Sequence, residues 1–143
     1  LAVFDADAAE AIMEQEVSLQ DWYLAGHSLG GVMASSFAAD QTDRVDGLIF
    51  LASYPSNDLT DAPFPVLSIY GSEDEVLNRE SYDEAQAKLP DDYTEIVLDG
   101  GNHGQFCDYG PQEGDGTASI SALQQQQQTV EAITAFIGNS HQQ

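Results

Sequence analysis

The feature that most constrains the fold is a short apolar run that leads directly into a serine flanked by glycines. Trp22 to Ala25 has the pattern of a strand, and Gly26-His27-Ser28-Leu29-Gly30 follows it at once. This pentapeptide fits G-x-S-x-G, in which the serine sits on a sharp turn between a strand and a helix. The glycines two residues before and two after the serine are expected to relieve crowding there. The stretch therefore predicts a strained turn that projects the Ser28 hydroxyl above a sheet.

Strand-like and helix-like segments alternate along the rest of the chain. Strands are predicted at Trp22–Ala25, Val45–Ala52, Pro65–Gly71 and Tyr93–Leu98, and helices at Phe4–Leu19, Leu29–Ala39, Asn78–Leu89 and Ser121–Ile137. The second strand is almost continuously apolar, which is typical of a strand buried on both faces of a parallel sheet. The alternation predicts an α/β fold with a parallel sheet of about four strands and flanking helices.

Two of the helices have apolar positions that indicate which face is buried. Ala9, Ile12, Met13 and Val17 are predicted to line one face of the first helix. The last helix has an apolar stripe at Leu123, Val130, Ile133 and Ile137, with Phe136 beside it. The run Gln124–Gln128 is of low complexity and is interpreted as the solvated part of that helix.

The chain is strongly acidic. Its 25 aspartates and glutamates face only three lysines and arginines, which gives a formal net charge of −22 over 143 residues. The acids are scattered, so they do not predict a single acidic binding face. Because carboxylates hold water and salt screens their repulsion, we interpret the composition as adaptation to high salt. Nucleic acid and anionic membranes are not expected as partners, since few basic side chains are available to meet phosphate.

The length fits one domain over residues 1–143. No apolar run reaches transmembrane length, so no membrane segment is expected in this chain. The cytoplasm of a salt-adapted organism is the favoured location, and a secreted or membrane-anchored protein stays open if a segment precedes Leu1. The single cysteine, Cys107, excludes an intrachain disulfide and is interpreted as a small buried filler. No metal-ligand spacing such as His-x-x-x-His occurs, and no metal or cofactor is expected.

Three residues that follow predicted strands form a candidate catalytic set. A serine hydroxyl is a poor nucleophile unless a base takes its proton, and the base needs a carboxylate that fixes its tautomer. His103 lies in the long glycine-rich loop Asp99–Thr117 and is the expected base; His27 adjoins Ser28 and is expected to point elsewhere, and His141 is near the terminus. Asp74 is the expected acid, with the alternatives Glu73, Glu75 and, after the second strand, Asp58.

These motifs resemble the carboxyl-terminal part of an α/β-hydrolase, in particular the small, lidless branch related to dienelactone hydrolases. Gly26–Gly31 resembles the family's elbow, Ile69–Asp74 its strand followed by an acid, and Gly100–Phe106 its histidine loop. The resemblance implies Ser28 as nucleophile, Asp74 as acid and His103 as base. It also implies that the backbone N–H of Leu29 donates to the oxyanion.

The resemblance also implies strands before the elbow strand that this sequence does not contain. The loop after one of them supplies the second oxyanion donor in the family. We therefore hypothesise that the chain is a fragment, or that it pairs with another chain that carries the missing amino-terminal strands. The segment Ser53–Pro65, where hydrolases of this fold often insert a lid, is short. It predicts an open site for a small-molecule acyl substrate.

The predicted function is that of a serine hydrolase acting on carboxylic esters or related acyl bonds through an acyl-enzyme intermediate. Peptidase and acyltransferase chemistry use the same triad, and the sequence does not separate them. The alternative is a non-catalytic binding domain on a hydrolase scaffold, because a fold does not fix a function.

Overall fold

Four parallel strands form the centre of the molecule in the computed structural model, which describes residues 8–141. The strands are β1 (Tyr23–His27), β2 (Gly47–Leu51), β3 (Val66–Gly71) and β4 (Tyr93–Leu98). They lie in the order β1-β2-β3-β4, and each neighbouring pair is parallel. The predicted α/β class and the four parallel strands are thus confirmed. Every strand runs in the same direction, so the segments that follow the four strands leave the sheet at one edge.

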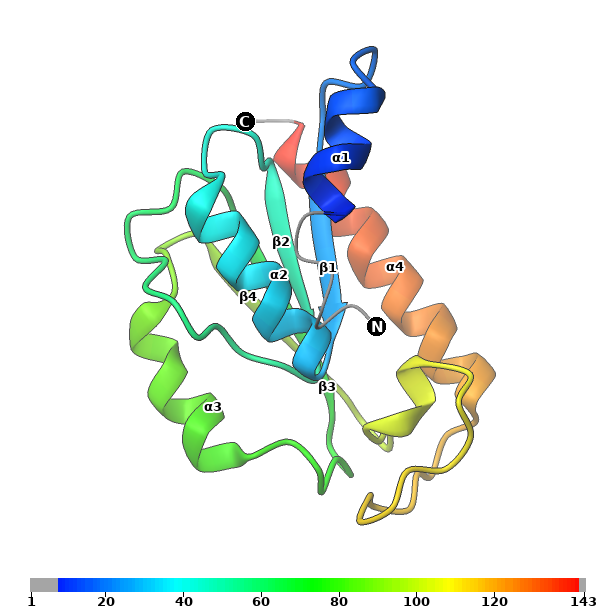
Figure 1. Cartoon of the computed structure of the whole chain (residues 1–143). Coiled ribbons are helices and arrows are strands. Elements are labelled where there is room, and N and C mark those ends of the chain that lie inside the picture. Colours follow the sequence, from blue (N-terminus) through cyan, green and yellow to red (C-terminus); the bar gives the residue numbers. More distant parts are fainter. Residues whose placement is uncertain (1–7, 142–143) are drawn as a thin grey trace.

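Helices cover both faces of this sheet. They are α1 (Ala8–Gln15), α2 (Leu29–Asp40), α3 (Arg79–Ala85) and α4 (Ala122–Ser140), with short 3-10 helices at η1 (Gln86–Lys88) and η2 (Gly104–Phe106). Figure 1 shows α2 and α3 on one side of the sheet and α4 on the other. The fold is therefore a three-layer arrangement in which parallel strands are joined by helical crossovers.

The two layers of core follow from the alternation of side chains along β2 and β3. Leu48, Phe50 and Val66 belong to the cluster that packs beneath α2. Ile49, Leu67 and Ile69 belong to the second cluster, against α4. A strand that buries alternate residues on opposite faces must be apolar at nearly every position, which explains the continuous apolar run in the sequence.

The prediction for the first helix is wrong in its end and in its buried face. Its start at Phe4 lies outside the described residues, and α1 ends at Gln15 because the next residues form a turn closed by the Leu19 N–H on the Glu16 carbonyl. Met13 is the one buried residue of α1, while the side chains of Ile12 and Val17 are exposed.

The predicted buried face of the last helix is also partly wrong. Leu123 and Val130 are 66% and 62% exposed, whereas Gln125, in the run interpreted as solvated, is fully buried. Thr129 is buried too, and Ile133 and Phe136 pack on the sheet. The buried face is rotated from the predicted one because the amino-terminal half of α4 packs against the polar His103 loop. Only the carboxyl-terminal half of α4 packs against the apolar core.

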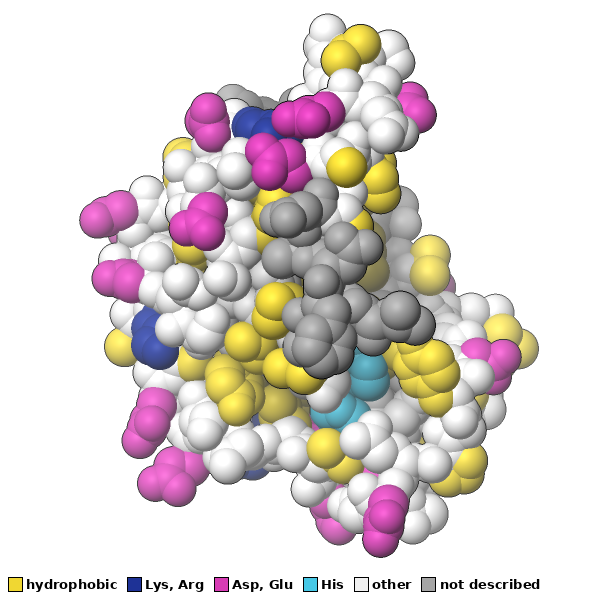
Figure 2. Space-filling view, in the orientation of Figure 1, with side chains coloured by type: hydrophobic (Ala, Val, Ile, Leu, Met, Phe, Trp, Pro, Cys, Tyr) yellow, Lys and Arg dark blue, Asp and Glu magenta, His cyan; other side chains and the backbone are white. Residues whose placement is uncertain are grey.

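Acidic side chains are spread over the visible surface as separate groups, and basic side chains are few (Figure 2). Described ion pairs include a contact of 3.4 Å between Arg44 and Glu10. Across residues 8–141, no helix combines the length and the apolar character that a membrane crossing requires.

Candidate active site

Ser28 occupies a strained turn between β1 and α2. Its backbone has φ 54° and ψ −126°, a conformation that residues with a side chain rarely adopt. The Ser28 N–H donates to the Leu51 carbonyl over 3.0 Å, and the Ser28 carbonyl accepts from the Ser53 hydroxyl over 2.6 Å. Strain of this kind persists only where surrounding contacts hold it, and these two bonds tie the turn to the end of β2.

The glycines around the turn act differently from the prediction. A Cβ on Gly26 would overlap the backbone of Gly30, as expected for a close strand-to-helix approach. A Cβ on Gly30 itself would meet nothing, so the predicted crowding at that position is wrong. The crowded residue is Gly31, where a Cβ would overlap the side chain of Ser53. The glycine that the turn needs on its helix side is therefore one residue further along.

Asp74 is buried in the turn that follows β3. Its Oδ1 accepts the backbone N–H groups of Val76 and Leu77 at 2.9 and 2.8 Å. These bonds lock the carboxylate in one orientation and leave Oδ2 directed at the next loop. The neighbouring Glu73 and Glu75 are exposed.

His103 meets this carboxylate. Its Nδ1 lies 2.8 Å from Asp74 Oδ2, and both side chains are almost completely buried. Burial alone would raise the pKa of Asp74, but the bonds from His103, Leu77 and Val76 outweigh it and hold that pKa below its ordinary value. A carboxylate that stays ionised accepts the Nδ1–H bond, which leaves the other ring nitrogen, Nε2, unprotonated in the neutral ring.

Ser28 and His103 line the same hollow at the carboxyl edge of the sheet. Its volume is about 200 Å³, and Leu29, Val32 and Leu77 form part of its wall. The Nε2 atom of His103 is buried and has no hydrogen-bond partner among residues 8–141. No hydrogen bond joins it to Ser28 within this described part, but such bonds often form only when substrate is bound. The backbone N–H of Leu29, the first residue of α2, is one that a helix leaves unpaired.

Sequence reasoning missed the residues that hold the histidine loop. Asp115 accepts the backbone N–H groups of His103 and Gly104 at 3.1 and 2.8 Å. Gln125 binds both the N–H and the carbonyl of Asn102 at 3.1 and 2.8 Å. The spacing from Gln125 to Phe136, which are on the same buried face of α4, is a sequence signal that marks Gln125 as facing inward.

The structure also bears on two other residues singled out from the sequence, Asp58 and Cys107. Asp58, the outside candidate for the acid, is exposed and binds the N–H and hydroxyl of Thr60. Its position in the loop after β2 leaves it outside the residues that line the hollow. Cys107 is only half-buried, so its interpretation as a buried filler is wrong. Its sulfur lies 3.4 Å from Nδ1 of His27.

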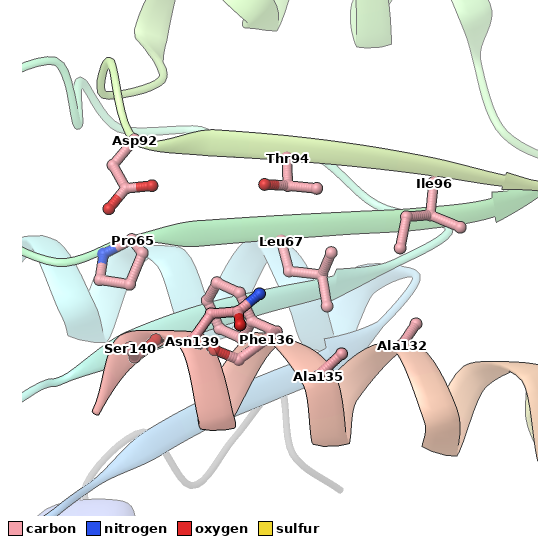
Figure 3. A pocket seen from close by; sticks show the side chains of 10 residues that line it. All are labelled: Pro65, Leu67, Asp92, Thr94, Ile96, Ala132, Ala135, Phe136, Asn139 and Ser140. Atoms are coloured by element: carbon pink, nitrogen blue, oxygen red, sulfur yellow. Dashed lines mark hydrogen bonds between the residues drawn. The ribbon is translucent and has the colours of Figure 1, made fainter. Parts of the chain in front are cut away.

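A larger cavity of about 310 Å³ lies away from these residues, between α4 and the strands β3 and β4 (Figure 3). Leu67 and Ile96 line it from the strands and Phe136 lines it from α4, and Asp92 and Asn139 are among its polar lining residues. Within residues 8–141, no group of three or more histidines, cysteines or acids could hold a metal ion.

A comparison with models of protein families identifies the family of this chain. Residues 1–127 match the model described as the Alpha/beta hydrolase family. The chain belongs to the alpha/beta hydrolase family. The match covers the elbow, the Asp74 turn and the His103 loop together. The narrower resemblance to dienelactone hydrolases stays a prediction. A search of curated proteins gave no match.

Solved structures of alpha/beta hydrolases share the fold of this chain at low sequence identity. A predicted CIB-like hydrolase from Thermoplasma acidophilum is 19% identical with a TM-score of 0.60, over 76% of this chain and 54% of that one. A monoacylglycerol lipase from Paleococcus ferrophilus is 15% identical with a TM-score of 0.59, over 76% of this chain and 69% of that one. A meta-cleavage product hydrolase from Pseudomonas fluorescens is 13% identical with a TM-score of 0.71, over 97% of this chain and 72% of that one. This chain thus spans about half of the Thermoplasma protein.

Proposed function

We propose that this chain carries the catalytic triad of a serine hydrolase that cleaves carboxylic esters or related acyl bonds. One observation supports the proposal above all others: His103, which lines the same hollow as Ser28, is bound to Asp74 through Nδ1, while its buried Nε2 is unpartnered among residues 8–141. A buried polar nitrogen without a partner costs free energy, and such groups are often functional. A base oriented by a carboxylate is what a serine nucleophile requires.

In the proposed acylation step, Ser28 Oγ attacks the carbonyl carbon of the ester and His103 Nε2 takes the hydroxyl proton. The tetrahedral intermediate carries its negative charge on the former carbonyl oxygen, to which the Leu29 N–H donates. Asp74 stabilises the imidazolium through its bond to Nδ1. The intermediate then collapses, and the alcohol leaves with the proton from His103.

Water completes the reaction. His103 Nε2 takes a proton from a water molecule, whose oxygen attacks the acyl carbon on Ser28. The second tetrahedral intermediate collapses, Ser28 Oγ regains a proton from His103, and the carboxylic acid is released. The atoms balance as ester and water giving acid and alcohol, and no cofactor is needed.

The hollow favours small acyl groups as substrates. Its volume of about 200 Å³ is below the usual range for sites that enclose a drug-sized ligand. The segment that connects β2 to β3 is short, and none of its residues beyond Tyr54 lines the hollow. The names of the similar structures include hydrolases and a lipase, which supports the class of reaction and leaves the acyl group to experiment.

The outer edge of β1 is a further part of the proposal. Among the described residues β1 pairs with β2 alone, so the N–H and C=O groups on its other side are open to another strand. We propose that a strand outside this chain pairs there and that its following loop supplies the second oxyanion donor. A missing donor lowers the rate by roughly a hundred- to a thousandfold. A stable monomer of this chain with the turnover of a complete esterase would contradict this part.

The function is tested by hydrolysis of p-nitrophenyl esters, in molar salt because of the proposed salt adaptation. We expect turnover of acetate and butyrate esters in preference to palmitate, and loss of turnover in Ser28→Ala. A folded chain that binds these esters without turning them over, even when the strand proposed to pair with β1 is supplied, supports the non-catalytic binding domain instead. Preference for palmitate contradicts the proposed substrate size.

A further inference from the structure

His27 is the last residue of β1, directly before Ser28, yet its ring turns toward the loop that carries His103. The centroids of the two imidazole rings lie 4.7 Å apart. Nε2 of His27 lies 2.9 Å from the backbone carbonyl oxygen of His103, and Nδ1 lies 3.4 Å from the sulfur of Cys107. The side chain that the sequence predicted to point elsewhere thus joins the nucleophile strand to the histidine loop.

We propose that His27 is a positioning residue: its neutral ring, oriented by the Cys107 thiol, donates to the His103 carbonyl and fixes the base relative to Ser28. The proposal rests on the proposed hydrolase function. Because His27 adjoins Ser28 in the chain, a bond from its ring to His103 couples the positions of nucleophile and base through a single residue.

The hydrogen-bond chemistry decides the tautomer of His27. A carbonyl oxygen only accepts, so the nitrogen that faces it, Nε2, must carry the proton. In a neutral ring Nδ1 then has a free lone pair, and the thiol of Cys107 donates to it. The donors run in one direction, from Cys107 to His27 and on to the His103 carbonyl.

The surroundings keep this ring neutral. Burial, and next the proximity of His103, lower the pKa of His27. The bond to the His103 carbonyl and the charges of Asp74 and Asp115 act in the opposite direction and are outweighed. A protonated His27 would also direct Nδ1–H at the thiol and break the chain of donors. It would place a second cation beside the imidazolium that forms on His103 during the reaction. When the His27 ring is neutral, Asp74 stabilises that imidazolium without a second positive charge beside it.

The simplest competing explanation is aromatic packing, because the His27 ring also lies against Phe106 with centroids 5.8 Å apart. Two variants separate the explanations. His27→Phe keeps an aromatic ring and removes the donor, whereas His27→Gln offers an amide N–H to the same carbonyl. We expect His27→Phe to lower kcat by about tenfold to a hundredfold with little change in KM, which is the size of effect expected from a misplaced catalytic group. We expect His27→Gln to recover most of that loss.

The thiol is tested in the same assay. Cys107→Ser keeps a donor to Nδ1 and should retain activity, and Cys107→Ala should lower kcat by a few fold. Wild-type activity in His27→Phe, or an equal loss in His27→Phe and His27→Gln, overturns the positioning role.

A spectroscopic measurement on the full wild-type chain tests the tautomer without any assay of activity. Histidine ¹⁵N resonances distinguish protonated from unprotonated ring nitrogens. We expect His27 at neutral pH to have a protonated Nε2 and an unprotonated Nδ1, and Cys107→Ala to shift the Nδ1 resonance. A proton on Nδ1 overturns the positioning proposal whether or not the chain hydrolyses esters. The expected tautomer in a folded but inactive chain counts against the proposed function alone.

Discussion

Two of the hollows in the described part of the molecule lie beside the same sheet and differ in kind. The hollow at the carboxyl edge, about 200 Å³, contains a histidine bound to a buried carboxylate and borders Ser28. The cavity beneath α4, about 310 Å³, is larger, but apolar side chains line it from the strands and from α4, and its polar lining residues Asp92 and Asn139 are exposed (Figure 3). The comparison shows that convergence of buried polar groups, rather than volume, distinguishes a candidate catalytic site in this fold.

The difference follows from the parallel sheet. All four strands deliver their following segments to one edge, so the turns after β1, β3 and β4 bring Ser28, Asp74 and His103 together. The cavity beneath α4 is a gap between a helix and the face of the sheet, where strand side chains are apolar.

The largest effect is expected for Ser28→Ala. Removal of the proposed nucleophile should lower kcat by about a millionfold, because the remaining residues of a triad contribute little without it. The measurement is steady-state hydrolysis of p-nitrophenyl butyrate. Ser56→Ala, which changes an exposed serine outside the hollow, is the matched control and should retain wild-type activity. Turnover in Ser28→Ala close to wild type would remove this hollow as the site.

Asp74→Asn is expected to come next. The amide keeps the size of the side chain but disfavours the tautomer of His103 that accepts at Nε2, and a loss of roughly ten-thousandfold in kcat is typical of this change. Glu73→Gln, at the exposed neighbouring position, should change kcat by less than about twofold. Equal losses in the two variants would show that the acidic loop acts through its overall charge.

Gln125→Leu tests the support of the histidine loop. The amide of Gln125 binds both backbone groups of Asn102 and accepts from Gln105, so its loss leaves buried polar groups unpaired. We expect the free energy of unfolding to fall by about 1–3 kcal/mol in urea denaturation. Gln127→Leu, on the exposed face of α4, should leave it within about 0.5 kcal/mol. Equal stability of the two variants would contradict the role of Gln125.

The pKa of His27 predicts a weaker, pH-dependent effect. It is lowered in the native state from the ordinary value of 6.5, so as the pH falls through 6.5 the unfolded chain takes up a proton that the native chain does not. The free energy of unfolding should therefore decrease on acidification until the native His27 also titrates. His27→Gln should show a shallower decrease over the same interval. A steeper decrease in that variant would contradict the direction of the shift.

The smallest effect is expected in the larger cavity. Ala135→Leu fills part of it without touching the carboxyl edge. We expect kcat and KM to change by less than about twofold, since surface changes remote from a site are usually near neutral. A large loss of activity in this variant would show that the cavity beneath α4 also contributes to catalysis, which contradicts the comparison of the two hollows.

Much of this arrangement could be predicted from sequence. The four strands follow from apolar runs. Because Ser28, Asp74 and His103 each follow a strand of a parallel sheet, their meeting at one edge of that sheet could also be predicted. The buried face of α4 could not be predicted from hydrophobicity, because Gln125 is buried against polar backbone. The contacts of His27 could not be predicted for a related reason: its partners, His103 and Cys107, are separated from it by 76 and 80 positions in the chain. Only the fold brings them into contact.

The central claim is that Ser28, activated by His103 and Asp74, is the nucleophile of this chain. The most direct test is reaction of the folded chain with a fluorophosphonate in molar salt, followed by mass spectrometry of the modified peptide. We predict one adduct, on Ser28, that forms far more slowly in Asp74→Asn. An unmodified Ser28 in the folded wild-type chain, with the strand proposed to pair with β1 supplied, would contradict the claim, and so would an adduct on another residue.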